Sequence, residues 1–387
     1  MNAMSTPQPD ELAWTLPVYA QLALEPVGGK GAWLELADGR RILDLYGGHA
    51  VAALGYGHPR LVAALQDQVR RLTFQSNLLP LALRARACEA LARFAPPGLD
   101  RVFLVNSGAE ANENALKLAF RSPGRTRVVA VEGAFHGRTA AAAAVTWGSE
   151  KWYGFPQKPF DVSFVSPRDP AALQQKVGDD TAAVIVEPVQ GVAGAVDLPT
   201  EFLAAARDVT RAAGALLIFD EVQCGMGRTG RPFAADYYGI TPDILTTAKG
   251  LAGGFPAGAV ITTPEIAAGL KIGELGTTFG GGPMACAAID TVIGVIQDEH
   301  LLDNVRTVSQ QVRATCLVGP VQSIQGAGFL LGLVCSRPAK QIQAELLEHG
   351  ILAGTSGDPR VLRLLPPLTL EPEHVAMLAA ALAEIAP

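Results

Sequence analysis

Between residues 101 and 263 the chain alternates short, almost uninterrupted apolar runs with amphipathic stretches. The runs have the length of β-strands and are rich in Val and Ile, and their lack of polar alternation indicates burial on both faces of a sheet. A regular succession of such strands and helices predicts an α/β fold whose mostly parallel sheet is covered by helices. We expect strands at 101–108, 127–133, 182–191, 214–223, 243–249 and 258–263, with helices at 109–120 and 201–213.

Both ends of the chain have a different pattern. Residues 12–45 contain short strand-like runs, with a β-hairpin expected around Asp38-Gly39, and the C-terminal part mixes helices with short strands. We therefore predict a large central domain and a smaller domain built from both termini. The expected limits are 1–50 for the N-terminal segment, 51–285 for the large domain and 286–387 for the C-terminal part of the small domain.

Composition narrows the class of protein. The net charge of -6 argues against a nucleic-acid binder, which would need clustered Lys and Arg. The five cysteines are scattered and contain no CxxC pair, so we expect neither a disulfide framework nor a zinc site. The polar N-terminus lacks the apolar core of a signal peptide, and no apolar stretch approaches the ~18 residues of a membrane span. We expect a cytoplasmic protein without metal, nucleic-acid or membrane partners.

Polar or aromatic side chains follow five of the expected strands, at the edge where open α/β sheets bind their ligands. The first of these groups is the turn Asn106-Ser107-Gly108-Ala109, which leads from a strand into a helix. The free N–H groups at the start of that helix form a potential anion site, and Gly108 allows a phosphate to approach the backbone closely. The alternative is a plain N-cap in which Ser107 caps the helix and nothing binds.

Asp220 directly follows the apolar run ALLIF and is expected at the end of a buried strand. A buried carboxylate is unfavourable unless it is paired, and a protonated pyridine nitrogen would be a suitable partner. The alternatives are a salt bridge to a protein Arg or Lys, or a metal ion. The metal is the weaker alternative because only Cys224 lies nearby at ligand spacing.

Lys249 is the only charged residue in the stretch 244–263. A surface role is the usual interpretation for a lysine, but burial in such a stretch would lower its pKa and make the amine nucleophilic. The glycine-rich segment that follows can wrap closely around a planar ligand. The step from Asp220 to Lys249 has the length of one strand–crossover–strand unit, which predicts that both groups lie at the same edge of the sheet.

Six ordered motifs together give this chain a resemblance to the class III aminotransferases, and within them to the acetylornithine and ornithine aminotransferase branch. The resemblance extends from Tyr19 through the segment DLYGGHAVAALGYGHP to Arg363, which is almost the whole chain. The motifs are NSGAEANE at 106–113, AFHGRT at 134–139, EPVQG at 187–191, LLIFDEVQCGMGRTG at 216–230, AKGLAGGFPAGA at 248–259 and TTFGGGP at 277–283.

The resemblance implies the fold of the aspartate-aminotransferase type (fold type I) and a homodimer with active sites at the subunit interface. It also implies pyridoxal 5'-phosphate (PLP) as cofactor, with Lys249 as the Schiff-base lysine and Asp220 as the partner of the ring nitrogen. The other residues that it assigns to the cofactor are Ser107, Gly108, Ala109, Phe135, His136, Glu187, Val222, Gln223 and, from the other subunit, Thr278. The residues that it assigns to substrates are Tyr19, Arg138, Thr277 and Arg363.

Three positions depart from the family pattern. Val192 stands where the family commonly has a glutamate that pairs with the second arginine, so Arg363 would lack its usual gate. Gly282 stands where Asn is usual. His49 stands where an aliphatic residue is frequent, and we interpret it as a packed or solvent-facing residue or, alternatively, as a residue of the pocket.

The function that follows is a two-step amino transfer from an ω-amine donor to 2-oxoglutarate, which gives an aldehyde and glutamate. N-acetylornithine is the first choice of donor, and ornithine, succinylornithine, 4-aminobutyrate or a non-natural amine is the alternative. A relative that takes its substrate on an acidic carrier protein would need a basic rim, which the net charge does not support. An aminomutase and a non-catalytic PLP-binding protein are the remaining alternatives.

Overall fold

The computed structural model describes residues 11–121 and 124–387, and a seven-stranded sheet forms its largest layer. The strand order is β4-β12-β11-β10-β7-β5-β6, and all neighbours are parallel except β12, which is antiparallel to β11 and to β4. The prediction of a mostly parallel α/β sheet is therefore confirmed. The strands are β4 (Arg101–Val105), β5 (Arg127–Val131), β6 (Asp161–Val165), β7 (Thr181–Val186), β10 (Leu216–Asp220), β11 (Ile244–Thr247) and β12 (Gly258–Thr262).

Alternate residues of these strands enter two different hydrophobic clusters, one on each face of the sheet. In β10, Leu217 and Phe219 belong to one cluster, whereas Ile218 belongs to the cluster that contains the apolar face of α4 (Gly108–Ala119). Both faces of the strand are buried, which explains why its sequence is apolar without alternation. Helix α7 (Thr200–Ala213) contacts β7 and β10 and contributes Phe202 to the first cluster.

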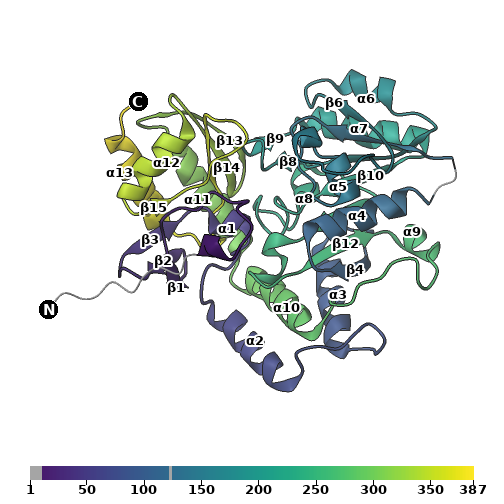
Figure 1. Ribbon diagram of the computed structural model, residues 1–387, viewed down its shortest axis with the longest axis horizontal. Coiled ribbons are helices and arrows are strands. Elements are labelled where there is room, and N and C mark those ends of the chain that lie inside the picture. Colours follow the sequence, from purple (N-terminus) through teal and green to yellow (C-terminus); the bar gives the residue numbers. More distant parts are fainter. Residues whose placement is uncertain (1–10, 122–123) are drawn as a thin grey trace.

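Strands from both ends of the chain share a second, four-stranded sheet. Its order is β1-β2-β3-β15, so the hairpin predicted around Asp38-Gly39 lies beside a strand from the C-terminal part. Figure 1 shows these elements in one lobe with α11, α12 and α13, while the large sheet lies in the other lobe. The lobe without the large sheet includes β1 (Pro26–Lys30), β2 (Trp33–Leu36), β3 (Arg41–Asp44), α11 (Leu301–Thr315), β13 (Val321–Ala327), β14 (Leu330–Cys335), α12 (Ala339–Glu348), β15 (Ile351–Leu352), β16 (Val361–Leu364) and α13 (Pro372–Glu384).

Helix α10 (Pro283–Asp298) connects the two lobes in sequence and packs against α2, α3 and the turn that carries Lys249. The predicted limit at residue 285 falls inside this helix, and the domain limits remain a prediction. No helix among the described residues is long and apolar enough to cross a membrane. The remaining elements are η1 (Glu11–Ala13), α1 (Gly47–Ala50), α2 (Pro59–Arg71), α3 (Ala82–Phe94), α5 (Ala140–Ala144), η2 (Ser149–Lys151), α6 (Pro170–Lys176), β8 (Val189–Gln190), β9 (Val196–Asp197), α8 (Ala234–Tyr238), η3 (Lys249–Ala252) and α9 (Pro264–Ala268).

Candidate active site

A cavity of about 430 Å³ lies at the carboxyl ends of the central strands. It brings together residues that are far apart in sequence, including all five of the predicted strand-end groups. Its lining includes Val51, Asn106, Ser107, Gly108, Ala109, Asn112, Phe135, His136, Arg138, Glu187, Asp220, Val222, Gln223, Lys249 and the segment 254–257.

Lys249 begins the short helix η3, immediately after β11 and Ala248. Its φ of 43° is in the left-handed region, which is rare for a non-glycine residue and is found most often at functional sites. Burial lowers the pKa of the Lys249 amine, while the carboxylates of Asp220 and Glu187 act in the opposite direction. Lys249 lines the cavity, and its amine gives up a proton more readily than a surface lysine does.

Asp220 is the last residue of β10, which runs parallel to β11 with Asp220 opposite Thr246. Its Oδ1 accepts a hydrogen bond from the N–H of Val222 at 3.0 Å, and its Oδ2 accepts from Asn112 and His136, both at 2.7 Å. No Lys or Arg of the described residues forms a salt bridge with it. The alternative of a salt bridge to a protein Arg or Lys is therefore wrong, and the carboxylate faces the cavity.

The turn from β4 into α4 combines a cap with close packing. Ser107 caps the helix, and its Oγ accepts a hydrogen bond from the N–H of Glu110 at 3.2 Å, as the N-cap interpretation predicted. This cap does not occupy the other N–H groups of the first turn, and Gly108 and Ala109 line the cavity. A Cβ at position 108 would lie 2.7 Å from Val222, so only glycine fits this turn.

Phe135, His136, Glu187 and Gln223 form the polar and aromatic wall of the cavity. The Glu187 carboxylate accepts hydrogen bonds from the N–H groups of Phe135 at 2.7 Å and Gly191 at 3.2 Å. Burial raises the pKa of Glu187, and the nearby Asp220 raises it further. His136 Nε2 and Gln223 Oε1 are buried without a hydrogen-bond partner among the described residues, which suits a site that is completed by a ligand.

Two arginines lie near the cavity in different settings. Arg138 is exposed and lines the cavity, with its guanidinium 4.6 Å from the ring centre of Trp152 and 5.8 Å from that of Phe135. Arg363 is 5% exposed and donates to three neutral oxygens: the carbonyls of Thr355 and Gly191 and the hydroxyl of Tyr46. No carboxylate of the described residues pairs with it, as the valine at position 192 predicts.

His49 is exposed, as the solvent-facing interpretation predicted, and together with Tyr46, which was not assigned a role from the sequence, it forms the surroundings of Arg363. The Tyr46 hydroxyl lies 2.7 Å from His49 Nδ1, and four consecutive residues from Gly47 to Ala50 have a positive φ. Partial burial, Arg363 and Lys249 lower the pKa of His49. The glycine pair at 47–48 was the only sequence signal for this left-handed turn.

Four predicted site residues lie outside the lining of this chain's own cavity: Tyr19, Thr277, Thr278 and the buried Arg363. Tyr19 is 80% exposed in the N-terminal segment. The Thr277 hydroxyl accepts a hydrogen bond from the N–H of Gly280 at 3.1 Å and lies 3.3 Å from the side-chain amide of Asn106, and Thr278 is exposed. The role predicted for Thr278 on the other subunit stays a prediction.

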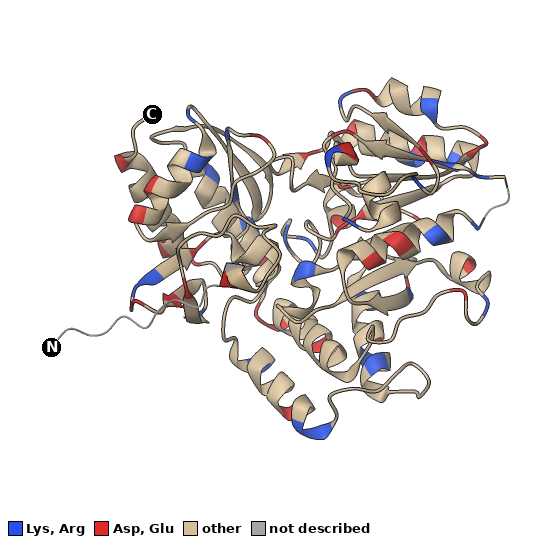
Figure 2. Ribbon diagram, in the orientation of Figure 1, with Lys and Arg blue, Asp and Glu red and all other residues tan. Residues whose placement is uncertain are grey.

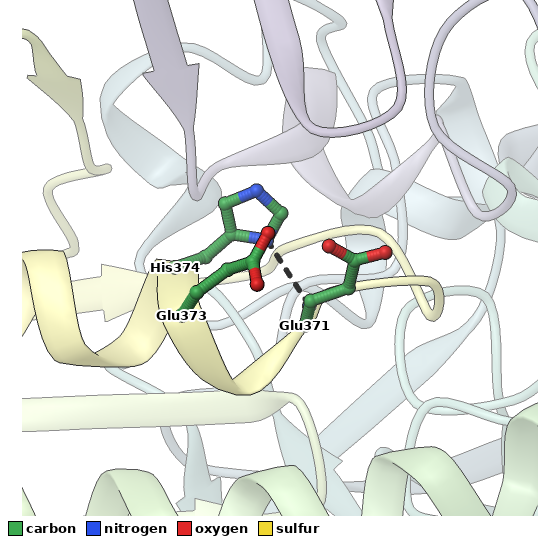
Figure 3. Close-up of side chains that lie close together, drawn as sticks. All are labelled: Glu371, Glu373 and His374. Atoms are coloured by element: carbon green, nitrogen blue, oxygen red, sulfur yellow. Dashed lines mark hydrogen bonds between the residues drawn. The ribbon is translucent and has the colours of Figure 1, made fainter.

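Glu371, Glu373 and His374 lie close together at the start of α13 (Figure 3), and none of them lines this cavity. His374 Nδ1 accepts from the N–H of Glu371 at 3.1 Å, and the Trp33 indole N–H points at its Nε2 at 3.2 Å. Because N–H groups face both ring nitrogens, neither nitrogen is free to bind a metal ion. The cluster therefore adds no metal site.

Comparison with known proteins identifies the family. The family model described as Aminotransferase class-III matches residues 18–386. The chain belongs to the class-III aminotransferases. It is 45% identical over 373 residues to the acetylornithine aminotransferase of Streptomyces coelicolor, which covers 94% of this chain and 91% of that protein. It is 40% identical over 382 residues to the acetylornithine/succinyldiaminopimelate aminotransferase of Yersinia pestis, which covers 93% of this chain and 92% of that protein.

A solved structure supports the same family and its cofactor. The ornithine aminotransferase of Toxoplasma gondii, which has PLP at partial occupancy in its active site, superposes with a TM-score of 0.90 at 31% identity. The match covers 97% of this chain and 92% of that chain. As a class-III aminotransferase, this chain is a PLP-dependent transaminase, and the predicted fold of the aspartate-aminotransferase type is confirmed.

The residues of the cavity fit PLP. The cavity is lined by a helix start that suits a phosphate, a carboxylate that suits a protonated ring nitrogen and a buried amine that suits an aldehyde. Buried polar atoms without a hydrogen-bond partner among the described residues remain in its wall. Asn112 is a polar cavity residue that the sequence analysis missed, as it missed Val51 and Phe255, although Asn112 stands beside Ala111 and near Ala115 on the buried face of α4. That contrast was a signal that could have identified it.

Proposed function

We propose that this class-III aminotransferase moves an amino group from an ω-amine, in first place N-acetylornithine, to 2-oxoglutarate. One observation carries the chemistry: the carboxylate of Asp220 and the amine of Lys249 stand at the ends of adjacent parallel strands in one cavity. The choice of donor is supported by the similarity to the acetylornithine aminotransferase of Streptomyces coelicolor.

Bound PLP supplies an electron sink for the substrate carbon, and the protein supplies position and proton transfer. The Asp220 carboxylate is held by three donors and faces the cavity, where a protonated ring nitrogen would be its partner. Lys249 Nζ, with its lowered pKa, holds and releases the proton that moves at the substrate carbon. The ring of Phe135 provides a flat apolar face beside these groups.

The two arginines suit acidic substrates. Arg138 offers a planar guanidinium fork at the edge of the cavity, and a fork of this kind binds a carboxylate through two hydrogen bonds. Arg363 is a buried cation that is held only by neutral acceptors, so its charge is not cancelled by the protein. We assign both arginines to the carboxylates of the donor and of 2-oxoglutarate.

The absence of an acidic residue at position 192 favours a second group of donors. With its charge uncompensated in both half-reactions, Arg363 suits donors that carry an additional carboxylate, such as succinylornithine. Ornithine, 4-aminobutyrate and simple amines remain alternatives within the same reaction class. An aminomutase would differ from all of these because it would turn over without 2-oxoglutarate.

We also propose that the enzyme is a homodimer and that Thr278 of one subunit reaches the cofactor phosphate of the other. Large apolar side chains are exposed on this chain, which is typical of a surface that another subunit covers. They include Trp14 at 93%, Leu78 at 87% and Phe279 beside Thr278 at 65%. The five cysteines are free thiols, which supports the proposed location in the reducing cytoplasm.

A donor screen tests the proposed function. The PLP form of the enzyme is incubated with acetylornithine, succinylornithine, ornithine, 4-aminobutyrate and a simple amine, and loss of the visible absorption of the bound cofactor is followed. We expect the fastest loss with acetylornithine and recovery of the absorption when 2-oxoglutarate is added. The Lys249→Ala variant is the control and should lack the visible band. A colourless wild type after reconstitution, or a band that no donor changes, would contradict the proposal.

A further inference from the structure

Asn112 makes contacts that the proposed function does not yet explain. It is 1% exposed on α4, and its side-chain amide has a partner in every direction. The two N–H bonds of Nδ2 point to the carbonyl of His136 and to Oδ2 of Asp220, both at 2.7 Å. Its Oδ1 accepts a hydrogen bond from the hydroxyl of Thr246, also at 2.7 Å.

Two acceptors determine which way this amide faces, and the Thr246 hydroxyl completes its contacts. If the amide turned over, its oxygen would face two acceptors, the Asp220 carboxylate and the His136 carbonyl, and its N–H₂ would face the Thr246 hydroxyl. The Thr246 hydroxyl donates to the amide oxygen in the observed orientation, in which every group meets a complementary partner. Three elements of the fold, α4, β10 and β11, are thereby joined at one buried point.

The consequence for Asp220 is a fixed direction. A carboxylate has about four sites for hydrogen bonds, and three of those of Asp220 are occupied by Asn112, His136 and the N–H of Val222. The remaining site belongs to a side chain that lines the cavity. A Lys or Arg in this place would cancel the charge of the Asp220 carboxylate. The amide of Asn112 is neutral, so it holds the carboxylate and leaves that charge in place.

We propose that Asn112, which the hydroxyl of Thr246 holds in place, is a positioning residue that aims the Asp220 carboxylate at the ring nitrogen of the cofactor and leaves its charge available there. This inference rests on the proposed function, because it requires PLP in the cavity. Asn112 and Thr246 act through Asp220 and touch neither substrate in this scheme.

The protonation of the ring nitrogen tests the inference directly. Wild-type enzyme and variants are reconstituted with PLP that carries ¹⁵N in its ring, and the chemical shift of that nitrogen is measured. We expect a protonated nitrogen in the wild type and a shift toward the unprotonated range in Thr246→Val and in Asn112→Leu. We also expect kcat to fall about tenfold, as for the loss of one hydrogen bond, with KM changed less than about twofold.

Two further variants make the test specific. Thr247→Val is the matched control, since Thr247 is the next residue of β11 and its buried hydroxyl has no partner among the described residues. It should keep the wild-type ¹⁵N shift. Thr246→Ser retains the hydroxyl and should have the wild-type ¹⁵N shift that Thr246→Val loses. This pair of variants tests the inference even if Asn112→Leu does not fold.

The outcomes separate this inference from the proposed function. If the wild type binds PLP and turns over, but Thr246→Val keeps its ¹⁵N shift and kcat, the role of Thr246 and Asn112 is wrong and the function stands. The same conclusion follows if Thr247→Val changes the shift as much as Thr246→Val does. If the wild type binds no PLP, the proposed function falls, and this inference falls with it.

Discussion

Arg363 holds a positive charge in a buried place where its partners are all neutral. A lone buried guanidinium is unfavourable, and burial accordingly lowers the pKa of Arg363. Its Nη1 donates to the carbonyl of Gly191 at 3.1 Å, and the next residue along the chain is Val192. A side chain at position 192 therefore starts within reach of this cation and can change what the cation binds.

Val192→Glu is expected to shift the donor preference. The new carboxylate would pair with Arg363 and cancel its charge when the bound donor has no carboxylate at that end. The kcat/KM of such ω-amino donors should therefore rise relative to that of succinylornithine. The ratio of kcat/KM for the two kinds of donor measures the effect, and a change of about tenfold corresponds to one charge-assisted hydrogen bond. Val192→Gln, which has the same size and no charge, is the control. An unchanged donor profile in Val192→Glu would remove this gating role.

Arg138→Ala should weaken the binding of carboxylated substrates far more than the binding of PLP. The side chain lies at the exposed edge of the cavity and stacks on Trp152 and Phe135, so its loss leaves the phosphate turn and Asp220 in place. We expect KM for 2-oxoglutarate to rise roughly 10- to 100-fold, the value of a charge-assisted hydrogen bond or two. Steady-state kinetics and a PLP titration measure the two effects. Arg211→Ala, an exposed arginine at the end of α7, serves for comparison; equal kinetics in both variants would exclude Arg138 from the site.

At the scale of elements, Glu221 shows how the same strand end serves two purposes. Asp220 faces the cavity, whereas Glu221 turns away and accepts hydrogen bonds from the N–H groups of Ala234 and Ala235 at the start of α8. Burial raises the pKa of Glu221 from 4.5 to about 8. Between these values the folded chain holds a proton that the unfolded chain has released.

The free energy of unfolding should therefore fall as pH rises from about 4.5 to 8, because the unfolded state is favoured by releasing that proton. Each such group contributes up to about 1.4 kcal/mol per pH unit. In Glu221→Gln we expect the free energy of unfolding to fall less steeply over this range. Part of the fall should remain, because the pKa of Glu187 is raised as well. Urea unfolding at pH 5 and pH 8 measures the slope. Glu201→Gln, an exposed position on α7, should keep the wild-type slope, and an equally steep slope in Glu221→Gln would contradict the prediction.

The sequence was sufficient for six of the seven strands of the large sheet and for the residues at their ends, because buried strands and functional turns both leave local signals. The edge strand β6 was not predicted. Lys249 stood out as a lone charge, and Asp220 followed an apolar run. The direction of β12 was not predictable, since an apolar run reads the same in a parallel and an antiparallel strand. The contacts of Asn112 with Thr246, and of Tyr46 with His49, depend on which residues meet in space, and no spacing along the chain specifies them.

At the scale of the whole molecule, acidic and basic residues are interspersed over both lobes (Figure 2), so no large region of one sign marks a partner. The exposed apolar residues are a stronger indication. Trp14, Leu16 and Val18 extend from the N-terminal segment, and Phe279 lies next to Thr278. These surfaces support the proposed dimer, in which each cavity would be completed by the other subunit.

Complementation between two inactive variants tests that arrangement. Lys249→Ala removes the amine, and Thr278→Asp places a negative charge where the proposed phosphate contact would be. Both should be nearly inactive alone. When the two are unfolded together and refolded, mixed dimers should form with one intact site, which uses Lys249 of one chain and Thr278 of the other. Activity should return to about a quarter of the wild-type value, since half of the dimers are mixed and each has one working site. If the mixture remains as inactive as its components, the sites are not shared in this way.

The parallel pairing of β10 with β11 has a consequence for how such an enzyme can change. Neighbouring strands lie about 4.8 Å apart along the hydrogen-bond ladder. Asp220 ends β10 and Lys249 follows the end of β11 by two residues, so the sheet and the short turn into η3 together set their separation. The residues that would recognise substrates come from other segments: Arg138 lies at the exposed edge of the cavity, and Arg363 is buried near it. Substitutions at the rim can therefore alter which amine is accepted while the reaction centre keeps its dimensions, and new donors can be acquired without rebuilding the chemistry.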